Sequence, residues 1–217
     1  MSATLVSISQ PLIKTKDESR YLTAEEFISY CARVSNPSNQ LNTETSSRLL
    51  AYCIKHQHWS IFEQVSCTFE IKTSRAIAAQ ILRHRSFSFQ EFSQRYSTTT
   101  GVEDLEWRQQ GKTNRQVGDK SIELSSALEF KVQQAQRLAT EAYEELIEQG
   151  VARECARMIL PLNTSTTLYM NGTVRSWLHY LELRTKEDTQ KEHRDIALEI
   201  QKIFKKHFPS VSEALGW

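Results

Sequence analysis

The stretch EQVSCTFEIKTSRAIAAQILRHRSFSFQEFSQRY (residues 63–96) contains three patterns in succession. Apolar and polar residues first alternate, which predicts a half-buried strand over 63–72. We expect the inward face of this strand to carry Val65, Cys67, Phe69 and Ile71. Helical spacing follows over 73–85, and the last fourteen residues are dense in polar groups. A strand that leads into a helix, in a chain with several further amphipathic segments, predicts an α+β fold.

The predicted helix over 73–85 has Thr73 or Ser74 as its N-cap. Its core-facing side chains are expected to be Ile77, Ile81 and Leu82. Residues 83–85 would then lie in its last turn, where the helix dipole favours cations.

Residues 83–96 combine three arginines, one histidine, one glutamate and three serines, with Phe87, Phe89 and Phe92 between them. Such groups cannot all be buried without partners, because unpaired buried charge is costly. A solvated basic strip is the simplest interpretation, but the alternating phenylalanines would anchor one side of the segment. Arginine's planar fork makes two-point contacts with phosphate or carboxylate. The segment therefore predicts a site for an anionic ligand such as a nucleotide.

The charge balance limits the class of ligand. The chain has 27 Lys+Arg and 26 Asp+Glu, so the positive charge is local, whereas a nucleic-acid-binding domain is usually basic overall. A small anion fits this balance better than a duplex does. We expect no nucleic-acid partner and no membrane partner, because no stretch approaches the roughly 20 apolar residues of a membrane span. The N-terminus lacks a secretory pattern, which predicts a cytoplasmic protein.

The four cysteines stand alone, without the CxxC spacing of redox or zinc sites. They are predicted to be reduced core thiols, at Cys31, Cys53, Cys67 and Cys155. No pattern predicts a metal site, a P-loop, a GxGxxG turn or a Ser-His-Asp order.

The rest of the chain is predicted to form helices, short strands and one long polar loop. At 217 residues we expect a single domain over 1–217, with a small antiparallel-type sheet flanked by several helices. Thr23 and Glu26 have the spacing of a capping box, which predicts a helix through 35. The other predicted strands cover 3–9 and 165–172, the other helices 43–58, 121–149, 155–161, 174–184 and 188–207, and the surface loop or lid 98–120.

Several polar residues outside 83–96 also indicate a site. His58 lies in a donor-rich corner with Ser60 and Glu63, although it could simply end a helix. Arg157 lies on an apolar turn and needs an anionic partner, either a structural carboxylate or a ligand. Arg175 and His179 share one helix face, because they are four residues apart. Arg184 is nine residues beyond Arg175 and rotated by about 180° from it.

The chain resembles the flavin-dependent thymidylate synthases. The triplet at 83–85, seven residues and then Ser93 match the RHR-x7-S signature of that family. HWSIFEQVSCTFEI resembles the family's His-x-Ser/Thr-x-Phe-Glu stretch. CARVS at 31–35, CARMILP and VRSWLHYLELR resemble further family segments in the same order. This ordered set covers most of the chain and is far more specific than a lone RHR.

The resemblance implies an activity and a set of ligands. The family makes dTMP from dUMP with methylenetetrahydrofolate as carbon donor, FAD as hydride carrier and NADPH as reductant, in homotetramers with shared active sites. By resemblance the flavin-binding residues are His58, Ser60, Arg83, His84, Arg85, Glu91, Thr173, Val174, Arg175 and His179. The dUMP-binding residues are Gln80, Ile81, Leu82, Arg83, Glu91, Phe92, Ser93, Gln94, Arg95, Arg157 and Arg184. Thr173 and His179 stand where the family usually has Asn.

The family needs no protein nucleophile, which agrees with cysteines that lack an activating neighbour in sequence. Ser93, a hydroxyl with no adjacent base, is interpreted as a phosphate or base donor. The resemblance assigns the catalytic role to Arg184, which would favour the ionised uracil ring electrostatically. Two alternatives are a catalytically altered flavin- or nucleotide-binding protein of the same fold and a non-enzymatic nucleic-acid-binding protein.

Overall fold

The computed structural model describes residues 1–99 and 101–217, and is built on an antiparallel sheet of order β1-β2-β6-β3. The central strands β2 (Ser66–Ser74) and β6 (Ser165–Thr173) pair along their whole length, from Ser66 opposite Thr173 to Ser74 opposite Ser165. The edge strands are β1 (Ser2–Ile8) and β3 (Ser88–Glu91). The predicted α+β class with a small antiparallel sheet is confirmed.

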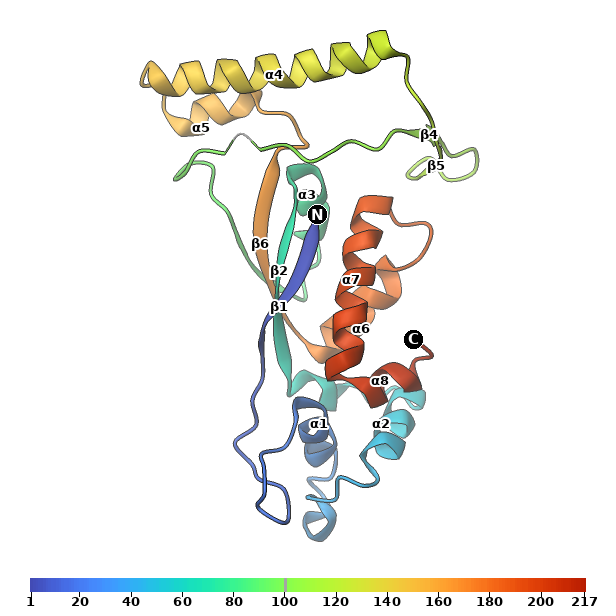
Figure 1. The fold of residues 1–217 in the computed structure, drawn as a ribbon. Coiled ribbons are helices and arrows are strands. Elements are labelled where there is room, and N and C mark those ends of the chain that lie inside the picture. Colours follow the sequence, from blue (N-terminus) through green and yellow to red (C-terminus); the bar gives the residue numbers. More distant parts are fainter. Residues whose placement is uncertain (100) are drawn as a thin grey trace.

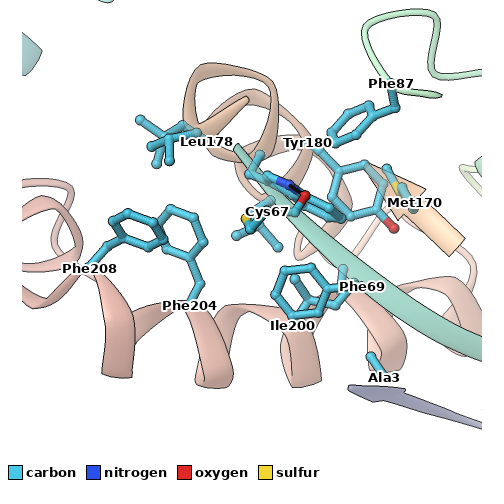
Figure 2. Close-up of a cluster of buried hydrophobic side chains, with 14 of the residues drawn as sticks. Ala3, Cys67, Phe69, Phe87, Met170, Leu178, Tyr180, Ile200, Phe204 and Phe208 are labelled. Atoms are coloured by element: carbon cyan, nitrogen blue, oxygen red, sulfur yellow. Dashed lines mark hydrogen bonds between the residues drawn. The ribbon is translucent and has the colours of Figure 1, made fainter. Parts of the chain in front are cut away.

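Alternation along β2 and β6 produces the core-facing side of the sheet. Cys67, Phe69 and Ile71 are each at most 1% exposed and lie opposite Gly172, Met170 and Leu168, respectively. Helices α6 (Val174–Arg184) and α7 (Lys191–His207) cover this face (Figure 1). In Figure 2 Ile200 of α7 lies against Phe69, and Phe204 and Phe208 stack beside them with ring centroids 4.5 Å apart.

The remaining helices lie beyond the two ends of the sheet (Figure 1). Helices α1 (Ala24–Ala32), α2 (Ser46–Lys55) and α8 (Pro209–Ala214) gather at one end, with 3₁₀ turns η1 (Pro37–Asn39) and η2 (Trp59–Glu63). At the other end lie α4 (Ser126–Glu148), α5 (Arg153–Ala156) and the 3₁₀ turn η3 (Arg157–Ile159). Short α3 (Arg75–Ile81) follows β2 directly.

Several sequence predictions hold in detail. The capping box at Thr23 and Glu26 is present, Ser74 caps α3, and α6 spans the predicted 174–184. Along α7, Ile196, Ile200 and Phe204 are buried as expected. Among the described residues no helix is long and apolar enough to cross a membrane.

Other predictions are wrong, and each has a local cause. Helix α3 ends at Ile81, so residues 83–85 lie beyond it, and Leu82 is 38% exposed instead of facing the core. Helix α2 ends at Lys55, because His56 and the positive-φ Gln57 turn the chain before His58. Helix α1 likewise ends three residues before the predicted 35.

The predicted loop over 98–120 contains strands β4 (Arg108–Gln110) and β5 (Gly118–Ser121), which pair as an antiparallel hairpin. Thr100, within that predicted loop, lies outside the described residues. Strand β3 and helix α8 were also not expected. Helix α4 has Tyr143 as its buried residue, whereas Leu128 and Leu138, predicted on its apolar face, are 45% and 57% exposed.

Candidate functional site

A tight turn connects α3 to β3 and carries residues 83–85. Its anchor is Phe87, which is 9% exposed and whose ring lies 4.7 Å from that of Trp177. Gly172 on β6 makes room for this ring, since a Cβ there would lie 2.4 Å from Phe87 Cδ1. With Phe87 held inside, Arg83 and Arg85 are exposed and His84 is half-buried.

His84 contacts the end of α6. Nε of Arg184 donates to Nε2 of His84 at 2.9 Å, and the His84 ring meets Tyr180 edge-on at 4.9 Å. Because Nε2 accepts this hydrogen bond, the neutral imidazole carries its proton on Nδ1. Burial and, secondarily, the Arg184 charge lower the pKa of His84 to about 4. The pair therefore presents one positive charge, on the guanidinium, near neutral pH.

Behind this pair runs a chain of hydrogen bonds that begins at the buried side chains of Tyr180 and His193 and continues through half-buried ones. The hydroxyl of Tyr180 lies 3.0 Å from Nε2 of His193, whose Nδ1 lies 3.4 Å from Oε1 of Gln80. Nε2 of Gln80 donates to Oε1 of Gln190 at 2.7 Å, and Gln190 donates in turn to Glu192. His193 is fully buried, and burial, then the Arg184 and His84 charges, lower its pKa to about 3. These bonds orient the Gln80 amide, with Oε1 toward His193 and Nε2 toward Gln190.

The carboxylate of Glu192 sets the direction of these hydrogen bonds, because it can only accept them. Glu192 also accepts from Arg108 of β4, so each amide in the chain is set to donate toward Glu192. Neutral His193 then donates through Nδ1 to Gln80 and accepts from the Tyr180 hydroxyl. The hairpin β4–β5 is thereby connected to the residues beneath His84.

A second group of residues lines a cleft at the other end of α3. The cleft has a volume of about 260 Å³ and is lined by Arg75, Gln94, Arg157, Met158, Leu160, Pro161, Leu162 and Thr164. Nε2 of Gln94 and Nε of Arg157 are buried, and no described residue offers either a hydrogen-bond partner. Buried donors without partners are rare and costly. These donors suit an anionic ligand with several acceptor oxygens.

Glu91 lies at the edge of this cleft and is held by two donors. Its Oε1 accepts from Nη1 of Arg75 at 2.6 Å and from Oγ1 of Thr166 at 3.0 Å. Ser93 and Arg95, which follow it, are exposed. Both side chains are therefore accessible to a ligand at this end of α3.

A third group surrounds the start of α6. Nη1 of Arg175 donates to Oε1 of Glu63 at 2.5 Å, and His179 meets Trp59 edge-on at 5.2 Å. Thr173 caps α6, and the hydroxyl of Ser176 donates to the carbonyl of Ser86 at 3.1 Å. This last bond connects the group to the turn at 83–85.

The three groups account for the positions of most predicted site residues. Gln80, His84 and Arg184 form the first; Glu91, Gln94 and Arg157 the second; and Thr173, Val174, Arg175 and His179 the third. His58 and Ser60 are exposed on η2 or just before it, near the third group. The side chain of Ile81 is fully buried, that of Val174 likewise, and Leu82 and Phe92 are 38% and 37% exposed. Helix α3 separates the first group from the second. Its seven residues rise by about 9 Å along the helix axis.

Sequence reasoning missed Arg75, Tyr180, Gln190 and His193. A signal existed for His193, because it lies three residues before Ile196 and seven before Ile200, on the buried face of α7. Arg75 is the one charged side chain between the Ser74 cap and Gln80. Its pairing with Glu91, sixteen residues away, depends on how β3 pairs with β6 and could not be deduced from local spacing.

Comparison with known proteins identifies the family. The model of the family described as "Thymidylate synthase complementing protein" matches residues 19–210. The flavin-dependent thymidylate synthase of Synechocystis sp. is 52% identical over the whole of both chains. The "Probable flavin-dependent thymidylate synthase" of Paramecium bursaria Chlorella virus 1 is 50% identical, also over the whole of both.

The chain belongs to the flavin-dependent thymidylate synthase family.

A solved structure agrees with this assignment. The UMP/dUMP methylase PolB from Streptomyces cacaoi, bound with 5-Br dUMP, is 25% identical and superposes with a TM-score of 0.82. The superposition covers 99% of this chain and 94% of that one. The predicted enzyme class and family are therefore confirmed, and this flavin-dependent thymidylate synthase family member shares its fold with a nucleotide methylase.

The four cysteines are all free thiols and differ in burial. Cys53 and Cys67 are buried, Cys31 is half-buried, and Cys155 is exposed, which corrects its predicted position in the core. Burial raises the pKa of the Cys31, Cys53 and Cys67 thiols, so all three resist ionisation. Among the described residues no cluster of His, Cys, Asp or Glu could hold a metal ion.

Proposed function

We propose that this chain methylates dUMP to dTMP, taking carbon from methylenetetrahydrofolate and hydride from FAD reduced by NADPH. Family membership supports the reaction, and the PolB complex is with a brominated dUMP. The observation that carries the proposal within this chain is the pair of buried, unpartnered donors on Gln94 and Arg157. They lie in a cleft with the size and charge of a phosphate site.

Each of the first two groups would bind a different part of dUMP. Gln94, Arg157, Ser93 and Arg95 would hold the phosphate, since their donors lie in or beside the cleft. Arg184 would lie against the uracil ring, with Gln80 as a further donor, and its charge would favour loss of the N3 proton. Ile81, Leu82 and Phe92 complete the proposed contacts.

The flavin would be bound by the third group and the turn at 83–85. The donor set fits a dinucleotide, because Arg83 and Arg85 are exposed guanidiniums, His179 offers a ring beside Trp59, and His58 offers one beside Tyr52. Ser60, Glu91, Thr173, Val174 and Arg175 are the other proposed contacts. When bound, FAD supplies the hydride, and the protein contributes orientation and charge. His84, neutral and held by Arg184, fixes the position of the arginine.

We also propose a homotetramer with active sites shared between subunits. Helix α4 supports it, because Leu128, Phe130 and Leu138 are 45–63% exposed on a helix that buries little of itself against this chain. The four free cysteines support a reducing compartment, the cytoplasm.

The test is product formation under anaerobic conditions. The protein should convert dUMP to dTMP only when FAD, NADPH and methylenetetrahydrofolate are all present, with one label from the methylene carbon in each dTMP. Conversion that continues without the folate would disprove the carbon donor. Flavin binding without any conversion would favour the alternative, a catalytically altered protein of the same fold.

A further inference from the structure

A buried histidine, His193, lies behind the Arg184–His84 pair and takes no part in the proposed binding of dUMP or flavin. Its ring centroid is 6.2 Å from that of His84, and its Nε2 lies 3.0 Å from the hydroxyl of Tyr180. Tyr180 is 2% exposed and lies on α6, one helical turn before Arg184. The Tyr180–His193 bond is therefore a buried polar contact next to the proposed catalytic arginine.

The Tyr180 hydroxyl has a narrow choice of partners among the rings around it. The ring of Tyr180 contacts those of His84, Phe87, Trp177 and His193, with centroids 4.9, 5.8, 5.6 and 5.8 Å away. An indole N–H can only donate and a phenyl ring has no nitrogen, whereas a neutral imidazole has one acceptor nitrogen. Within this group of rings, the two histidines are thus the possible acceptors for the hydroxyl.

The acceptor nitrogen of His84 is already in use. Its Nε2 accepts from Nε of Arg184 at 2.9 Å, and the other ring nitrogen carries the proton. His193 is available as an acceptor, because burial, then the Arg184 and His84 charges, lower its pKa to about 3 and keep it neutral. Each donor therefore has its own imidazole: Arg184 has His84, and the Tyr180 hydroxyl has His193.

We propose that His193 is a positioning residue for Arg184, because it accepts from the Tyr180 hydroxyl and so reserves His84 for the arginine. Without His193 the hydroxyl would be buried and unpaired, which is costly, and His84 would be the remaining imidazole beside it. Competition for Nε2 of His84 would then displace the guanidinium. This inference deepens the proposed function and rests on it, since the catalytic role of Arg184 is part of that proposal.

The experiment compares single-turnover dTMP formation by the FAD-loaded protein and its variants. His193→Leu should slow the reaction by about 10-fold to 100-fold, the effect of a shift of about 1 Å in a catalytic group. Adding Tyr180→Phe to His193→Leu should restore most of the rate, because it removes the competing hydroxyl and leaves neither partner unpaired. His193→Gln should also keep most of the rate, because its amide oxygen can accept from the hydroxyl.

Ile200→Val is the matched control for disturbing the core. Ile200 is fully buried on the same face of α7 and has no polar side-chain atom, so this variant should lose stability without losing rate. Thermal unfolding and the visible absorbance of bound flavin should be measured for every variant. If His193→Leu does not fold, His193→Met replaces it, because methionine adapts to irregular core space.

A normal rate in His193→Leu would overturn the inference and leave the proposed function intact. A slow rate that Tyr180→Phe does not restore would also overturn it, because disruption of the core alone has that result. If the unmodified protein forms no dTMP, the proposed function fails, and urea unfolding then tests the buried pair. Recovery of the stability of His193→Leu by Tyr180→Phe would support the pairing, and additive losses would overturn it.

Discussion

Arg184 and His84 are joined by a hydrogen bond of 2.9 Å in which the guanidinium donates and the imidazole accepts. The bond connects the last residue of α6 to the turn after α3, and it requires His84 to be neutral. The bond uses Nε, so the position of the guanidinium is set before a ligand meets its other donors. The account of catalysis depends on this arrangement.

Arg184→Ala should lower turnover by at least about 100-fold, the typical effect of removing one electrostatic stabiliser. Bound flavin should remain, because Arg184 is proposed to contact the uracil ring, whereas the proposed flavin contacts surround the start of α6. Single-turnover kinetics would measure the rate, and the visible absorbance of the variant would measure its bound flavin. Near-normal turnover would disprove the catalytic assignment, and Arg20→Ala, at an exposed position before α1, provides a control for the loss of an arginine.

His193 should make stability depend on pH. Its folded pKa of about 3 lies below the ordinary value of 6.5, so the unfolded chain binds a proton that the folded chain excludes. The free energy of unfolding should therefore fall as the pH drops below about 6.5, with a slope approaching about 1.4 kcal/mol per pH unit for one histidine. Half-buried His84, with a pKa of about 4, adds an effect of the same sign over the same pH range.

Urea unfolding between pH 4.5 and 7.5 would measure this slope. His193→Gln should reduce the slope to the part that His84 contributes, while His207→Gln, at an exposed position on the same helix, should leave it unchanged. An equally steep slope in His193→Gln would show that other groups cause the pH dependence.

Gly172→Ala should destabilise the protein by about 1–3 kcal/mol, the usual cost of overpacking a core. The new Cβ would lie 2.4 Å from the Phe87 ring, so the turn that carries His84 must move. Gly101→Ala is the matched control, because its Cβ would meet Ser165 Oγ at an ordinary 3.6 Å. Thermal unfolding compares the two, and equal stability of both variants would contradict the close approach.

Replacing the two accessible cysteines should not stop catalysis. Cys31→Ser with Cys155→Ser is expected to retain most of the activity, because no thiolate attacks the substrate in the proposed reaction. Cys53 and Cys67 are buried and cannot reach a ligand without unfolding. Steady-state rates measure the effect, and complete loss in a correctly folded double variant would require a cysteine nucleophile.

Local sequence patterns predicted the helices and strands that bury one regular face. Alternation located β2, and the apolar spacing of Ile196, Ile200 and Phe204 located α7, because burial on one face imposes a period. The resemblance supplied the family and the site residues. Together they predicted α+β architecture and a nucleotide-type anion site.

What could not be predicted depends on contacts between distant segments. The end of α3 at Ile81 follows from the burial of Phe87 against Trp177, ninety residues away along the chain. The Arg75–Glu91 pair and the Tyr180–His193–Gln80 chain require β3, α6 and α7 to be in place. The apolar residues of α4 recur with helical spacing, but most of them are not buried against other parts of this chain.

The visible absorption spectrum of the FAD-loaded protein under anaerobic conditions shows whether one site binds flavin and dUMP together. A shared site predicts flavin bands that bleach with NADPH, and a spectral shift of the bound flavin when dUMP is added. Protein that binds no FAD, or flavin whose spectrum is unaffected by saturating dUMP, would contradict it.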